Sequence, residues 1–155
     1  MYSLDDLLYL MARLRDPDTG CPWDVAQSYR TIAPSTIEEA YEVVDAIERG
    51  DQGHLREELG DLLFQVIFYS QLGKEDGHFD FAGIVSELVA KLIRRHPHVF
   101  PDGTLASRVE DQASVPTEVK QRWEAIKREE RAQKYPPRSS SAGKPSSGKS
   151  GPRRA

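Results

Sequence analysis

Cysteine is almost absent from this 155-residue chain, and long hydrophobic runs are missing. Cys21 is the only cysteine, so no disulfide can form within the chain, and we expect a reducing, cytoplasmic setting. No apolar run approaches the roughly 18 residues that a membrane-spanning helix needs. Asp5 and Asp6 make the start of the chain acidic where a secretion signal would be basic, so we do not expect export.

Acidic residues are lacking from residues 136–155, which hold five basic residues among proline, serine and glycine. Such a composition cannot bury a core, and it predicts a disordered basic tail over residues 135–155. The rest of the chain has 16 basic and 25 acidic residues, a net charge of −9. We predict one domain over residues 1–134 that needs cations to handle any anionic ligand, and no specific nucleic-acid binding.

Helical periodicity is clearest in residues 35–72. Apolar residues recur at three- and four-residue steps before and after Gly50, at Ile37, Ala40, Tyr41, Val44 and Ile47 and at Leu55, Leu59, Leu62, Leu63 and Val66. Ser35 and Glu38 have the spacing of a capping box, and Gly50 is placed to end the first helix. We predict two antiparallel helices joined by a short turn, each with its apolar stripe buried.

Helices are also predicted on both sides of this hairpin. The apolar pattern, caps and prolines indicate helices over residues 3–14, 81–95 and about 117–132. Between the first helix and the hairpin we expect a long loop with one helical turn near residues 27–31, and with Trp23 filling the core. The predicted fold class is therefore all-α, a compact four- to five-helix bundle built round the central hairpin.

Four carboxylates lie beside the two apolar stripes. Glu39 and Glu42 are three residues apart on one helix, and Glu58 and Asp61 on the other. A rise of 1.5 Å per residue places both pairs roughly 6–15 Å from the turn, so they should face each other. Like charges about 5 Å apart repel by roughly 3 kcal/mol, and oxygen ligands without histidine or cysteine favour Mg²⁺, Mn²⁺ or Ca²⁺.

A metal is one of two interpretations of this pattern, because carboxylate-rich helix faces are usually only solvated. Two features favour the metal. Both acidic pairs adjoin a predicted buried stripe, and Gly60 lies between Glu58 and Asp61 although glycine costs roughly 1 kcal/mol inside a helix. We expect something to pack very close to Gly60.

These residues resemble the MazG-type signature of the all-α nucleoside triphosphate pyrophosphohydrolases. The resemblance rests on Glu38-Glu39-x-x-Glu42 followed by Glu58-x-x-Asp61, and it spans roughly residues 4 to 134. It extends to residues 15–24, 60–66, 94–100 and 122–127. Several joined motifs in the same order make this a specific match, whereas the acidic pairs alone would be a weak one.

The resemblance implies hydrolysis of a nucleoside triphosphate to the monophosphate and pyrophosphate, with Mg²⁺ as cofactor and Mn²⁺ as the alternative. It also implies a homodimer, which Phe64, Phe68 and Tyr69 would favour by leaving apolar side chains on several faces. The implied metal ligands and catalytic residues are Glu39, Glu42, Glu58 and Asp61, with Glu38 as a neighbouring catalytic group or base. The implied substrate-binding residues are Lys91, Arg94, Arg95, Trp123 and Lys127.

Two other functions compete with this one. The chain most resembles the first copy in family members that carry two, so it could be a dimerisation or nucleotide-binding module with weak or no activity. A di-metal bundle for oxygen chemistry would normally show Glu-x-x-His, and here the matching position is Asp61, so we set it aside. We read His96 and His98 as structural contacts, with His96 a secondary phosphate candidate, because a proline separates them.

Overall fold

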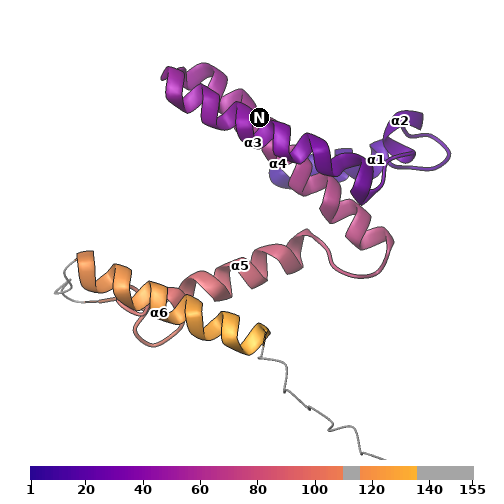
Figure 1. Ribbon diagram of the computed structural model, residues 1–155. Coiled ribbons are helices and arrows are strands. Elements are labelled where there is room, and N and C mark those ends of the chain that lie inside the picture. Colours follow the sequence, from indigo (N-terminus) through magenta and orange to yellow (C-terminus); the bar gives the residue numbers. More distant parts are fainter. Residues whose placement is uncertain (110–115, 136–155) are drawn as a thin grey trace, which may run out of the picture. The chain divides into compact units, whose positions relative to one another are not determined.

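The structure is a computed structural model that describes residues 1–109 and 116–135, so the predicted basic tail lies outside it apart from Tyr135. Over these residues the chain is all-α, as predicted (Figure 1). The helices are α1 (Leu4–Leu14), α2 (Pro22–Val25), α3 (Tyr29–Arg49), α4 (Gln52–Glu75), α5 (Phe81–Arg95) and α6 (Pro116–Lys134). None of them is long and apolar enough to cross a membrane. The chain divides into two units, Met1–Lys91 and Leu92–Ala155.

The predicted hairpin is α3 followed by α4, which lie side by side in Figure 1. Gly50 ends α3 with φ of 68°, a left-handed conformation that glycine adopts without strain. Asp51 then caps α4, because its side chain accepts a hydrogen bond from the backbone N–H of His54. Only two residues separate the helices, so they run antiparallel as predicted.

The start of α3 differs from the prediction. Ser28, not Ser35, is the N-cap, and it forms a capping box with Thr31, so the predicted box between Ser35 and Glu38 is wrong. Pro34 lies within the helix. A proline there removes one backbone donor, but the capping box and the burial of Ile32 stabilise the preceding turn.

The core of the first unit forms where α1, α3 and α4 meet. Its buried side chains are Met11, Ile32, Ile67, Phe68 and Leu72. Phe64 and Tyr69 pack against this core, and Phe68 is fully buried. Phe68 is therefore covered within one chain, whereas Phe64 and Tyr69 are only partly buried, and the homodimer that they were expected to favour stays a prediction.

The apolar stripe predicted for α3 is largely exposed, which corrects the expectation of a buried stripe. Ile37, Tyr41, Val44 and Ile47 are 62%, 71%, 50% and 56% exposed. The helix packs on α4 through a neighbouring, more polar face that includes Thr36 and Ala46. On α4, Leu59, Leu63 and Val66 are also partly exposed. The spacing of its apolar residues shows that a helix has an apolar face, but it does not show which other element packs on that face.

Trp23 was predicted to fill the core, but this prediction is wrong, because Trp23 is 63% exposed on α2. The segment is held instead by Arg15, whose Nη1 donates to the carbonyl oxygens of Asp24, Val25 and Gln27 at 2.6, 3.3 and 3.2 Å. The prediction of one helical turn near residues 27–31 is wrong, because the short helix of this segment is α2, at Pro22–Val25. Residues 29–31 already belong to α3.

The second unit contains the end of α5 together with α6. Arg94 and Arg95 both form ion pairs with Glu130 of α6, at 2.7 Å in each case. α5 ends at Arg95 before Pro97, and α6 begins at Pro116, as predicted. Two arginines on one carboxylate hold these helices together.

A candidate metal site between α3 and α4

A polar contact sets the register between the two hairpin helices. The Thr36 hydroxyl lies 2.6 Å from the Tyr69 hydroxyl and 3.2 Å from Oε1 of Gln65. The ring of Tyr69 also stacks on that of Tyr29, with centroids 6.2 Å apart. Because Thr36 lies one turn before Glu39 on α3, and Gln65 one turn after Asp61 on α4, this contact holds those carboxylates opposite each other.

Three of the four predicted ligands converge. Glu39, Glu58 and Asp61 each offer a carboxylate oxygen, and these oxygens all lie within 4.8 Å of one another. We call these residues the carboxylate group. Ions such as Mg²⁺ and Ca²⁺ bind oxygen at about 2.0–2.6 Å, so two ligands of one ion lie up to about 5 Å apart. The residues present therefore fit a divalent cation.

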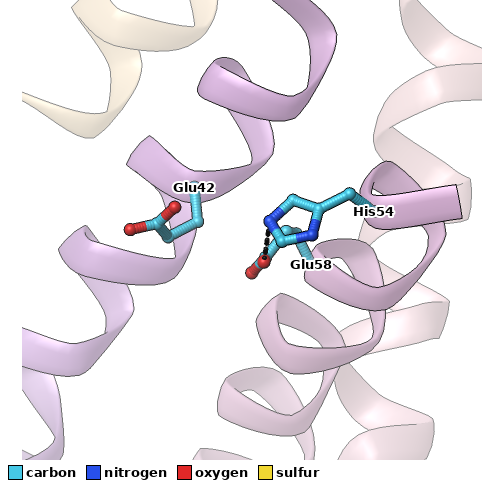
Figure 2. A group of neighbouring side chains, drawn as sticks. All are labelled: Glu42, His54 and Glu58. Atoms are coloured by element: carbon cyan, nitrogen blue, oxygen red, sulfur yellow. Dashed lines mark ion pairs between the residues drawn. The ribbon is translucent and has the colours of Figure 1, made fainter. Parts of the chain in front are cut away.

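The fourth predicted ligand, Glu42, belongs to a second set of residues. Glu42, His54 and Glu58 offer one ligand atom each within 4.8 Å, and we call them the mixed group. Figure 2 shows Glu42 on one helix and His54 with Glu58 on the other, joined by an ion pair from Nε2 to Oε1 at 2.8 Å. Sequence reasoning missed His54, although its spacing of four residues before Glu58 was visible.

The carboxylates have little cationic compensation. Within residues 1–109 and 116–135, no lysine or arginine nitrogen lies within 4.0 Å of a carboxylate oxygen of Glu39, Glu42, Glu58 or Asp61. Partial burial raises the pKa of Glu39, and the charges of Asp61, Glu58, Glu38 and Glu42 raise it further. The arrangement therefore favours binding of a cation between the helices.

Two expectations about the neighbours of this group differ in outcome. Glu38 is exposed and belongs to neither group, so its catalytic role stays a prediction. The expectation of close packing at Gly60 is wrong, because a Cβ added there would meet nothing within 4 Å. Gly73 is the tightly packed glycine of α4, since a Cβ there would come within 2.4–2.7 Å of the Phe79 ring.

Comparison with known proteins decides what kind of domain this is. Residues 27–100, which contain the carboxylate group and the mixed group, match the family model of the MazG nucleotide pyrophosphohydrolase domain. The chain contains a MazG domain. It is 56% identical over 134 residues to an Escherichia coli protein named nucleoside triphosphate pyrophosphohydrolase. This match covers 86% of the chain and 48% of that protein.

Two proteins from Thermotoga maritima are also similar to this chain. The MazG protein named nucleoside triphosphate pyrophosphohydrolase/pyrophosphatase is 38% identical over 130 residues, covering 84% of this chain and 46% of that protein. The crystal structure of a MazG-related protein has a TM-score of 0.63 and 26% identity, covering 81% of this chain and 99% of the other. The chain thus spans about half the length of the first two relatives.

Four of the five residues predicted to bind substrate outside the hairpin are engaged in local contacts in this MazG-domain protein. Arg94 and Arg95 are paired with Glu130. Lys127 lies over the ring of Trp123, with Nζ 3.8 Å from the centroid. The carboxylate group belongs to the first unit, and these residues to the second. Their roles, with that of Lys91, remain predictions.

Of the two histidines after α5, His96 makes a polar contact of the predicted kind, whereas Nδ1 of His98 is buried without a hydrogen-bond partner among the described residues. Nδ1 of His96 forms a hydrogen bond with the carbonyl oxygen of Leu92. The His98 ring lies 5.5 Å from that of His96, between centroids. Burial lowers the pKa of His98, and the positive charges of His96 and Arg122 lower it further. These contacts serve the second unit.

Proposed function

We propose that this protein hydrolyses nucleoside triphosphates to nucleoside monophosphates and pyrophosphate with Mg²⁺, or with Mn²⁺ as the alternative. The observation that carries the proposal is the convergence of Glu39, Glu58 and Asp61 within a segment that matches the MazG domain. The names of the similar proteins support the same reaction. In this reaction water is added across the anhydride bond between the α- and β-phosphates.

Within this proposal each carboxylate has a role. Glu39, Glu58 and Asp61 hold the cation. Glu42, which offers a ligand atom close to that of Glu58 in the mixed group, is a further ligand of the cation. A divalent ion bound there would offset phosphate charge and lower the pKa of a bound water. Glu38, next to Glu39 in the chain, would accept a proton from the attacking water. Lys91, Arg94, Arg95 and Lys127 would offset phosphate charge, and Trp123 would pack against the base or ribose.

The decisive experiment measures pyrophosphate and nucleoside monophosphate after incubation with each triphosphate and Mg²⁺. Asp61→Asn and Glu39→Gln should lower turnover by about 100-fold or more, because each removes a charged ligand. Asp45→Asn is the matched control, since Asp45 also lies on α3 but pairs with Arg49. Equal turnover in all of these variants would refute the proposed site.

Metal binding provides a second measurement. In the metal-free protein, Glu39→Gln should raise the melting temperature, because it removes one of the mutually repelling charges. Adding Mg²⁺ should stabilise the wild type by RT ln(1 + [Mg²⁺]/Kd), about 2.7 kcal/mol at 100 times Kd, and should stabilise this variant less. The same Mg²⁺ effect in both proteins would place the ion elsewhere.

A nucleotide-binding or dimerisation module is the second candidate, because the chain matches only about half the length of relatives that bear the enzyme name. The turnover assay separates the two functions. Retained nucleotide binding without pyrophosphate release would favour the module. Pyrophosphate release that depends on Asp61 would favour the enzyme.

We also propose that the protein forms a homodimer in a reducing, cytoplasmic setting, which its single cysteine favours. The exposed stripe of Ile37, Tyr41, Val44 and Ile47 supports a dimer, because a two-fold axis would pack this stripe against its own copy. Tyr41→Glu should give monomers in sedimentation analysis, while Tyr135→Glu, at an equally exposed tyrosine beyond α6, should not. A wild type that sediments as a monomer at every concentration would contradict this proposal.

A further inference from the structure

We propose that His54 is a positioning residue for the metal site: it holds the carboxylate of Glu58 in the orientation in which Glu58 binds the cation together with Glu39 and Asp61. This inference rests on the proposed function, because it concerns how the chain prepares Glu58 for the cation. It adds a residue that the acidic signature does not contain.

The first observation is the position of Glu58. It is the one residue common to the carboxylate group and the mixed group. It is also buried, at 8% exposure, whereas Glu42 and Asp61 are exposed and Glu39 is half-buried. A buried carboxylate needs a partner, since desolvation of a charge without one is costly. The orientation of this single side chain therefore affects both groups.

The second observation is that His54 supplies this partner. Its Nε2 lies 2.8 Å from Oε1 of Glu58, one helical turn further along α4 (Figure 2). Nε2 of the imidazole donates its proton in a hydrogen bond to this oxygen, and the carboxylate keeps its negative charge. Holding one of the two oxygens restricts rotation of the carboxylate about its terminal bond. The other oxygen then keeps a defined direction.

The third observation is that His54 itself is held in place. Its backbone N–H donates to Oδ1 of the N-cap residue Asp51 at 3.0 Å, which fixes the first turn of α4. The His54 side chain is 34% exposed, whereas its partner Glu58 is buried. A residue at the rim can orient a ligand without contacting the ion. Partners of this kind typically change metal affinity by roughly 10- to 100-fold when they are removed.

The test uses the full chain and Mn²⁺ as the probe, with free Mn²⁺ measured by electron paramagnetic resonance. His54→Ala should raise the Mn²⁺ dissociation constant by roughly 10- to 100-fold. His54→Gln should restore most of the affinity, because its amide keeps an N–H donor for Glu58. His78→Ala is the control, at an exposed histidine after α4. Without metal, His54→Ala should unfold at a lower temperature than the wild type, because the buried Glu58 loses its partner, whereas His54→Gln and His78→Ala should unfold near the wild-type temperature. Mn²⁺ binding is therefore compared at a temperature at which all four proteins are folded.

Each other outcome has a defined meaning. Wild-type affinity in His54→Ala would overturn the inference while leaving the proposed function in place. Affinity as weak in His54→Gln as in His54→Ala would also overturn it, because the imidazole would then be needed as a ligand. A wild type that binds no Mn²⁺ would instead refute the metal site, and with it the proposed function.

Discussion

Replacing Arg15 with methionine tests how the first unit is held together. The Arg15 side chain is only 11% exposed. Its Nη1 donates to three carbonyl oxygens in residues 24–27, its Nε pairs with Glu75 at 3.0 Å, and its guanidinium lies 5.5 Å from the centre of the Phe68 ring. Methionine keeps much of the apolar stem but removes the charge and every donor.

The size of the effect follows from these contacts. Hydrogen bonds to charged groups are worth about 1.5–3 kcal/mol each, but bonds that share one donor do not add. The ion pair with the partly exposed Glu75 adds up to about 1 kcal/mol, and the contact with Phe68 about 1–2 kcal/mol. We expect Arg15→Met to lower the free energy of unfolding by about 3–5 kcal/mol, a large part of the stability of a small domain.

Urea unfolding followed by circular dichroism at 222 nm measures this change. Arg13→Met is the matched control, because Arg13 lies in α1, two residues before the C-cap Arg15, is exposed, and contacts Tyr9 of the same helix. Its effect should stay within about 0.5 kcal/mol. Arg15→Lys should fall between the two, since lysine keeps the charge but loses the planar set of donors. Equal losses in Arg15→Met and Arg13→Met would refute the reasoning.

Two further predictions concern glycine packing and pH. Gly73→Ala should destabilise the protein by about 1–3 kcal/mol, because the new Cβ meets the Phe79 ring. Gly60→Ala should stabilise it by up to about 1 kcal/mol, because Gly60 lies at an open helical position. The urea midpoints of unfolding measure both changes, and equal effects of the two substitutions would contradict this packing. The Arg95 and Arg94 guanidinium groups lower the pKa of Glu130 in the folded state. The ionised carboxylate therefore stabilises the second unit at pH values above its unfolded-state pKa. This stabilisation is lost as the pH falls through the lower folded-state pKa. Glu130→Gln should therefore be less stable than wild type at neutral pH, with a difference that shrinks on acidification in thermal melts, while Glu129→Gln should show no such trend.

The local features of the fold could be predicted from the sequence. The cap at Ser3, the end of α3 at Gly50 and the end of α5 before Pro97 depend on backbone chemistry within a few residues. Spacing along two helices of known rise also predicted that Glu39 would face Glu58 and Asp61. The start of α3 was missed because Ser35 and Glu38 also have the spacing of a capping box, whereas the box that forms lies earlier, at Ser28 and Thr31.

The choice of buried face depended on tertiary structure. Ile37 and Tyr41 have the period of a buried stripe, yet they are exposed, because α4 packs on the adjacent face through Thr36 and its contacts with Tyr69 and Gln65. Trp23 is exposed for a similar reason, since Arg15 anchors its segment through backbone carbonyls that carry no sequence signal.

The acidic residues also separate what the sequence determines from what the tertiary structure determines. Their types and spacing, which the sequence determines, were enough to predict an oxygen-rich site across the hairpin. Their burial and pairing were decided by packing, which buries Glu58, leaves Asp61 exposed and places His54 against Glu58. The physical reason is that helical period and caps act over one turn, whereas burial depends on which residues of distant segments occupy the neighbouring space.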